Sequence, residues 1–78
     1  MAELRVDQEL NCRGLSCPWP VLKTKKAVDG LESGQVLRLI ATDPGSVNDM
    51  EAWTRTMGHI LLKAEQPPGE FVYYIQKK

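Results

Sequence analysis

Apolar residues recur at nearly every second position of residues 4–10, with charged side chains between them. This two-residue period is typical of a strand with one buried face. We therefore expect a strand over residues 4–10, followed by a loop over residues 11–17. Residues 35–42 are apolar at nearly every position, which indicates a strand in the interior of a sheet.

Two segments repeat their apolar residues every three or four positions, the period of a helix with one buried face. The first helix should begin at Pro18, because the N–H that proline lacks would be unpaired in the first turn, and it should end at Gly30. The second should begin near Ser46 and end at Gly58, a typical residue at a helix C-terminus. The side chains expected to face the sheet are Val21, Thr24, Val28 and Leu31 in the first helix, and Val47, Met50, Trp53, Thr54 and Met57 in the second.

The chain ends in two more strand-like runs, residues 60–64 and 71–75. The link between them is too short for a parallel crossover, so they should pair as a hairpin. The resulting order, β-α-β-α-β-β, predicts an α/β (α+β) two-layer sandwich, in which a four-stranded mixed sheet carries two helices on one face. A chain of 78 residues should form a single domain, residues 1–78.

The composition narrows the possible functions. Ten basic and ten acidic residues leave no net charge, so the long-range attraction behind generic binding to nucleic acids or anionic membranes is missing. The chain shows no signal-peptide pattern and no apolar run of membrane-spanning length, and we expect a cytoplasmic protein with no direct nucleic-acid or membrane partner. The one histidine, His59, and two cysteines fall short of a zinc site. We expect no metal and no cofactor.

Cys17 has the position of a reactive thiol. It directly precedes the helix expected to begin at Pro18, and the unpaired N–H groups and dipole at a helix N-terminus stabilise an anion. This placement can lower the pKa of a thiol below its usual value of about 8.5. Pro18 and Pro20 restrict the backbone and would hold the sulfur outward. Spacing alone also leaves open a buried, structural Cys17.

The residues around Cys17 resemble a known family signature. The stretch Asn11-Cys12-Arg13-Gly14-Leu15-Ser16-Cys17-Pro18-Trp19-Pro20 is similar to the Arg-Gly-Leu-x-Cys-Pro-x-Pro motif of the TusA (SirA-like) sulfur carriers, although its first two residues depart from those common in the family. Residues 41–49 resemble the family's second motif, and the resemblance covers the whole chain. It implies that Cys17 carries sulfane sulfur as a persulfide or thiosulfonate. The supporting residues of the motif are Arg13, Gly14, Pro18 and Pro20.

The resemblance also implies partners. The donor would be a cysteine desulfurase or a rhodanese-type protein, and the acceptor a DsrE/TusD-like or DsrC/TusE-like protein. Displacement at sulfur by a thiolate needs an exposed cysteine and little else, so no general base is needed nearby. We expect a protein that is a monomer when free and that does not turn over a small molecule alone. Relatives serve cytoplasmic sulfur oxidation or sulfur trafficking such as tRNA 2-thiouridine synthesis. The form of residues 41–46 favours sulfur oxidation by resemblance.

Cys12 and Arg13 each allow two interpretations. Cys12 lies five residues before Cys17 and is either a resolving or relay thiol, or an inert residue at the end of the first strand. We favour the inert role, because the sequence offers no geometry that brings the two sulfurs within disulfide reach. Arg13 either attracts an anionic sulfur species or holds the loop by hydrogen bonds.

Trp19, Lys23 and Lys26 share the side of the first helix that faces away from its core stripe. An exposed aromatic beside cations is typical of a docking surface, but a tryptophan lying flat over a loop beside solvated lysines would give the same pattern. A non-catalytic interaction or regulatory module that uses the Trp19 and Lys23 face is therefore the alternative to a sulfur carrier. A disulfide oxidoreductase is disfavoured, because the cysteine spacing is unlike Cys-x-x-Cys.

Overall fold

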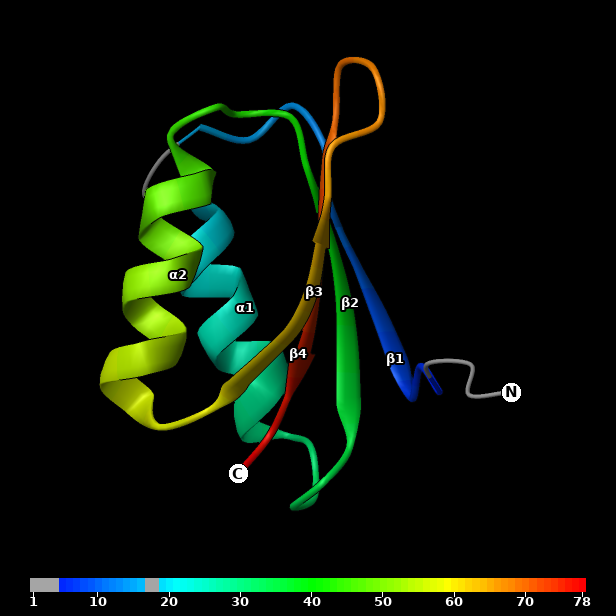
Figure 1. Ribbon diagram of the computed structural model, residues 1–78, viewed down its shortest axis with the longest axis vertical. Helices are drawn as coiled ribbons and strands as arrows, with labels where there is room; N and C mark the ends of the chain where they lie inside the picture. Colours follow the sequence, from blue (N-terminus) through cyan, green and yellow to red (C-terminus); the bar gives the residue numbers. More distant parts are fainter. Residues whose placement is uncertain (1–4, 17–18) are drawn as a thin grey trace.

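The computed structural model describes residues 5–16 and 19–78 of the chain. Both helices lie on one face of a four-stranded sheet (Figure 1). The predicted two-layer sandwich with the order β-α-β-α-β-β is confirmed. Its elements are β1 (Gln8–Cys12), α1 (Trp19–Asp29), β2 (Val36–Ala41), α2 (Ser46–Met57), β3 (Ile60–Glu65) and β4 (Phe71–Gln76).

The strands are ordered β1-β2-β4-β3 across the sheet. β1 and β2 are parallel, as the crossover through α1 allows, and β4 is antiparallel to both of its neighbours, β2 and β3. The predicted interior position of residues 35–42 and the predicted hairpin are therefore confirmed. The second strand of that hairpin lies next to β2, which leaves β1 and β3 as the edges of the described sheet.

The first strand differs from the prediction. β1 begins at Gln8 and continues through Cys12, so the predicted loop over residues 11–17 is wrong for its first two residues, while residue 4 lies outside the described part of the chain. Residues 5–7 are not part of the strand, and the strand ends two residues later than predicted because its parallel pairing with β2 continues, with Asn11 opposite Ile40 and Cys12 opposite Ala41. The sequence pattern did not indicate this continuation, because Asn11 is polar. Its side chain lies on the sheet face without helices, where a polar residue is compatible with a strand.

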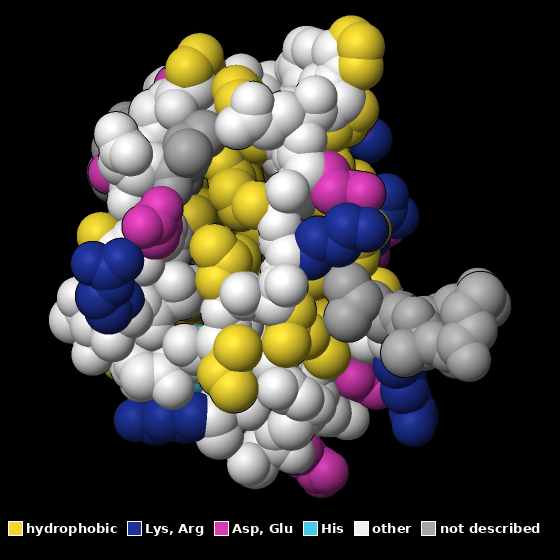
Figure 2. All heavy atoms as spheres, viewed as in Figure 1, with side chains coloured by type: hydrophobic (Ala, Val, Ile, Leu, Met, Phe, Trp, Pro, Cys, Tyr) yellow, Lys and Arg dark blue, Asp and Glu magenta, His cyan; other side chains and the backbone are white. Residues whose placement is uncertain are grey.

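The helix layer and the sheet enclose two adjoining groups of buried hydrophobic residues. Figure 2 shows hydrophobic side chains in the space between the two layers. Two buried threonines of the helices satisfy their hydroxyls locally: Thr24 donates to the Pro20 carbonyl at 2.6 Å, and Thr54 donates to the Met50 carbonyl at 2.9 Å. The buried side chains are Cys12, Leu39, Ala41, Met50, Tyr73 and Ile75 in the larger group, and Val28, Leu31 and Leu37 in the smaller one.

The predicted inner faces of the helices agree with this core. Thr24, Val28, Met50 and Thr54 are buried, whereas Val21, Trp53 and Met57 are half-buried at the margins of the helix layer. The side chain of Val47 lies outside the described part of the chain. Within residues 5–16 and 19–78, no helix is both long and apolar enough to cross a bilayer.

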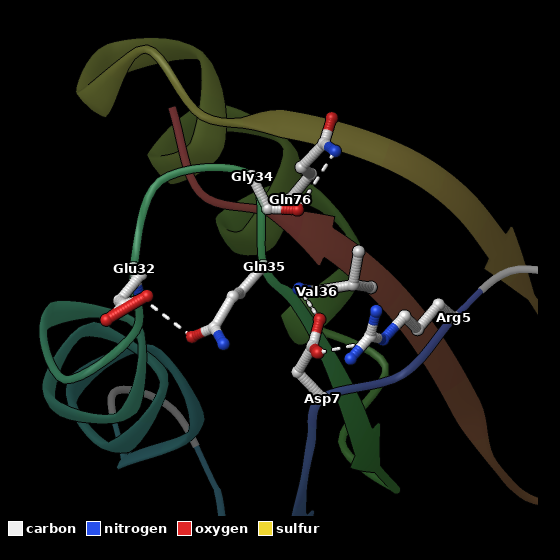
Figure 3. Close-up of polar contacts among 7 residues, drawn as sticks. All are labelled: Arg5, Asp7, Glu32, Gly34, Gln35, Val36 and Gln76. Atoms are coloured by element: carbon white, nitrogen blue, oxygen red, sulfur yellow. Dashed lines mark hydrogen bonds and ion pairs between the residues drawn. The ribbon is translucent and has the colours of Figure 1, made fainter.

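Hydrogen bonds and an ion pair join neighbouring segments at the end of the sheet where β2 begins (Figure 3). Asp7 accepts a hydrogen bond from the Val36 N–H at 2.9 Å and forms an ion pair with Arg5 at 3.3 Å. Gln76 donates to the Gly34 carbonyl at 3.1 Å, so β4 is bonded to the turn that precedes β2. Within that turn, the Glu32 N–H donates to Gln35 at 2.8 Å. These bonds fix this end and leave the opposite end for the loop that carries the motif.

Polar side chains cover the sheet face without helices. Arg38 on β2 pairs with Glu9 on β1 at 2.9 Å, and its guanidinium lies 5.9 Å from the centre of the Tyr74 ring. The Tyr74 hydroxyl in turn donates to Glu65 at 3.2 Å. Long side chains of this kind shield apolar neighbours with their stems, and Ile40 is only 3% exposed although this face has no second layer.

Candidate functional site

The candidate site is the segment between β1 and α1. Cys17 and Pro18 lie outside the described residues, so their predicted roles remain predictions. The residues on either side of them are described: the Trp19 N–H donates to the Ser16 carbonyl at 2.9 Å. In the sequence, Cys17 and Pro18 stand between this anchored loop and Trp19, the first residue of α1.

Arg13 anchors the first half of this loop. Its Nε donates to a carboxylate oxygen of Glu70, which lies immediately before β4. The hydrogen bond from Arg13 lowers the pKa of Glu70 below its usual value. The Arg13 N–H also donates to Asn11 at 3.0 Å, as in a turn initiated by asparagine. This contact holds the loop, with a carboxylate as the partner of Arg13, and the role of Arg13 toward an anionic sulfur species remains a prediction.

Gly14 makes the sharp bend that follows. It has a φ of 80°, a conformation that costs little only for glycine. Its N–H donates to the Thr42 hydroxyl at 2.9 Å, which joins the loop to the segment after β2. The next residue, Leu15, packs against the larger group of buried residues.

Two of these anchors were not identified from the sequence. Thr42 belongs to residues 41–49, which resemble the family's second motif, and this resemblance could have identified it as a site residue. Glu70 had no comparable signal, because it contacts Arg13 across 57 residues of sequence. The structure thus brings together three loops at one end of the sheet: the loop after β1, the loop after β2 and the hairpin turn before β4.

Cys12 is the cysteine that the structure describes, and it is fully buried in the core. Burial raises the pKa of its thiol, and the positive charge of Lys23 opposes this rise to a smaller extent. The thiolate is the nucleophilic form of cysteine. Cys12 therefore has the surroundings of an inert packing residue, in agreement with the interpretation favoured above.

The side chains of α1 divide into a buried side and an exposed side, as predicted. Pro20 is buried against the sheet, so it packs the helix as well as restricting its first turn. On the outer side, Trp19 is 55% exposed and Leu22 is 48% exposed, and Lys23 and Lys26 are exposed beside them. Trp19 is the first residue of α1, and more than half of its surface faces solvent.

The described residues present no gathering of three or more His, Cys, Asp or Glu side chains with the spacing of a metal site. His59 is the sole histidine in the sequence, and it packs against Trp53 at the other end of the molecule, with ring centres 5.3 Å apart. Its Nδ1 accepts a hydrogen bond from the Lys78 N–H at 3.2 Å. This histidine has a structural partner and is distant in the fold from the candidate site.

Comparison with known proteins defines the class. The sequence model of the family described as "Sulfurtransferase TusA" matches residues 8–77. The chain belongs to this family, and the resemblance seen in the sequence is confirmed. It is a sulfur carrier of the TusA type, a class that works between a sulfur donor and a sulfur acceptor.

Two curated relatives and one solved structure are similar to the chain over nearly their full lengths. The chain is 46% identical to the sulfur carrier protein TusA of Allochromatium vinosum, covering 91% of this chain and 93% of the relative. It is 43% identical to the putative sulfur carrier protein YrkI of Bacillus subtilis, covering 95% and 99%. The crystal structure of a SirA-like protein from Desulfitobacterium hafniense superimposes with a TM-score of 0.78 at 25% identity, covering 88% of this chain and 95% of that one.

Proposed function

We propose that Cys17 is the sulfur-carrying residue and that it accepts sulfane sulfur as a persulfide from a protein donor. The observation that supports this most is the environment of the other cysteine. The sequence contains two cysteines, and Cys12 is buried with a raised thiol pKa. A sulfur carrier of this family needs a nucleophilic thiol, which leaves Cys17, in the family motif directly before α1.

The transfer is a displacement at sulfur. The Cys17 thiolate attacks the outer sulfur of the donor persulfide, a bond forms between Cys17 Sγ and that sulfur, and the donor S–S bond breaks. The donor cysteine leaves as a thiolate, and the proton of the donor persulfide remains on the transferred sulfur. The same step in reverse delivers the sulfur to an acceptor. No external oxidant or reductant is required, because each S–S bond formed replaces one that is broken.

The surrounding residues would support this step by position. The bonds of Arg13 to Glu70 and of Gly14 to Thr42 hold the approach to Cys17, and a helix N-terminus favours the thiolate. Trp19, Lys23 and Lys26 would form the docking surface for donor and acceptor. We propose a desulfurase or rhodanese-type donor, a DsrE/TusD-like or DsrC/TusE-like acceptor, a cytoplasmic location, and a role in sulfur oxidation or in trafficking such as tRNA thiolation.

Mass spectrometry of the intact protein tests the role of Cys17. Wild type is incubated with a cysteine desulfurase and cysteine, or with a rhodanese and thiosulfate, and should gain the mass of one sulfur atom. Cys17→Ser should gain none, whereas Cys12→Ala, which keeps the motif thiol, should load like wild type. Equal loading of Cys17→Ser and wild type would contradict the proposal, as would a wild type that takes up no sulfur from either donor.

The exposure of Trp19 supports a second candidate, a non-catalytic interaction or regulatory module. Under this alternative the thiol is incidental, and Trp19 with Lys23 binds a partner. In cells that lack the wild-type gene, Cys17→Ser would then restore function, and Trp19→Ala would not. The sulfur carrier predicts that Cys17→Ser fails to restore function.

A further inference from the structure

The two edge strands of the described sheet differ in their protection against pairing with another chain. The pairing of β3 with β4 shifts its register between Leu61 and Lys63. A bulge and an exposed lysine are devices that discourage edge-to-edge pairing. β1, by contrast, pairs with β2 in unbroken register from Gln8 to Cys12. The outer edge of β1 keeps the regular geometry that an added strand requires.

The backbone groups of β1 alternate between its two sides. The Asp7 N–H donates to the Val36 carbonyl at 2.9 Å, toward β2. Because Val36 directs its backbone groups toward β1, Arg38 and Ile40 do so too. A residue of a parallel strand bonds to the residues on either side of its partner. Leu10, opposite Leu39, therefore bonds toward β2, and Glu9 and Asn11 present their N–H and C=O groups to the outer edge. No described strand lies beside that edge.

An open groove lies along the same edge, between β1 and α1. Its volume is about 370 Å³. Gln8 and Leu10 of β1 contribute to its lining, and two lysines stand on its helix side. The lining residues of this β1–α1 groove are Gln8, Leu10, Lys23, Lys26, Ala27 and Gly30.

The charge of the groove is positive. On the outer surface of α1, Lys25 forms an ion pair with Asp29 at 3.8 Å, but the ion pairs among the described residues include neither Lys23 nor Lys26. Two cations beside the apolar surface of Leu10 and Ala27 suit a segment with both apolar and acidic side chains. Charge complementarity therefore selects an acidic occupant.

We propose that an extended acidic segment of a sulfur-exchanging partner protein adds to β1 as a further strand and places carboxylates in the β1–α1 groove. This inference rests on the proposed function for the identity of the partner. Side chains alternate between the two faces of a strand, so acidic residues at every second position would meet Lys23 and Lys26. Trp19 and Leu22 lie exposed on the same helix, so the added strand would hold the partner on the element that directly follows Cys17.

Nuclear magnetic resonance on the ¹⁵N-labelled full chain tests this inference with a short peptide in which glutamate alternates with valine. The amide signals of Glu9 and Asn11 should shift, and their hydrogen exchange should slow, because both N–H groups gain acceptors. The charge-reversed Lys23→Glu/Lys26→Glu variant should bind the peptide about tenfold more weakly. Lys25→Glu is the control, since it reverses one lysine charge of the same helix outside the groove and should bind like wild type. The same spectra report whether each variant is folded.

Several outcomes would overturn the inference. These are no binding of the glutamate peptide, equal binding of a peptide with lysine in place of glutamate, or shifts confined to β3. Signals of Glu9 and Asn11 that change on dilution without peptide would show pairing with a second copy of the chain instead. The proposed function is measured separately, by the mass of wild type after loading from a donor, so that either proposal can fail without the other.

Discussion

At the scale of single residues, the two cysteines show how surroundings decide what a thiol can do. Cys12 continues β1 and faces the helices, where Leu39 and Met50 belong to the same group of buried side chains. Its thiol loses contact with water, and its pKa rises for that reason. Cys17 stands in the sequence between an anchored loop and α1. The sequence favoured an inert Cys12 but could not show that its thiol is buried, because burial depends on the pairing of β1 with β2.

Substitutions at Cys12 should therefore change stability and leave sulfur loading intact. Cys12→Ala removes one buried sulfur atom and should lower the free energy of unfolding by about 1 kcal/mol. Cys12→Ser should cost more, about 2 kcal/mol, because it buries a hydroxyl where a thiol packed against apolar side chains. Urea unfolding measures both values. A Cys12→Ala variant that folds but no longer accepts sulfur would show that Cys12 takes part in transfer.

At the scale of elements, loops and helix ends position the site. The loop after β1 is held by Glu70 and Thr42, which come from two other loops. α2 ends at Gly58, whose φ of 79° places it in the left-handed conformation, and whose N–H donates back to the Arg55 carbonyl at 3.2 Å. This is the glycine stop that the sequence predicts, and it directs the chain from α2 into β3.

Gly58→Ala should lower the free energy of unfolding by about 1 kcal/mol, because alanine is strained in the left-handed conformation. The only close neighbours of the added Cβ, within the described residues, belong to the flexible Lys78 side chain, so backbone strain should dominate. Gly30→Ala is the matched control: the positive-φ glycines of the described chain do not include Gly30, and a Cβ there would make ordinary contact with the Ala27 carbonyl. Thermal unfolding of both variants checks the difference. An equal loss at the two sites would contradict this account.

At the scale of the whole molecule, the C-terminal residues join parts that are distant in sequence. The Lys77 ammonium donates to the Asp29 and Leu31 carbonyls, at 3.3 Å and 2.8 Å, and so bonds the end of α1. The Lys78 N–H donates to His59, whose ring packs on Trp53 of α2. The two helices are thus connected to the same end of the chain, opposite the candidate site.

This connection predicts a dependence of stability on pH. Burial, with the positive charges of Lys78 and Lys77, lowers the pKa of His59 below its usual value. The unfolded chain therefore binds the proton at higher pH than the folded chain does, so stability is full above about pH 6.5 and declines as the pH falls through the lower pKa of the folded state. Urea unfolding between about pH 7.5 and pH 5 should show this decline.

His59→Phe provides the comparison for that measurement. Phenylalanine keeps an aromatic ring beside Trp53 but cannot bind a proton, so its stability should lose the part of the pH dependence that falls near neutrality. The variant also lacks the acceptor for the Lys78 N–H, which should lower its stability at pH 7.5. An identical decline in wild type and His59→Phe would assign the effect to other groups.

The sequence by itself determined the type and order of all six elements, the two-layer arrangement, the buried sides of the helices and the family to which the chain belongs. It could do so because hydrophobic periodicity and turn residues act over a few neighbouring positions, and because the motif from Asn11 to Pro20 is continuous. Only the tertiary structure decided the extension of β1 to Cys12, the burial of that thiol, the bonds of Arg13 to Glu70 and of Gly14 to Thr42, and the positive groove beside β1. Each of these depends on segments that are far apart in the chain and meet only when the strands pair, which is information that no local pattern contains.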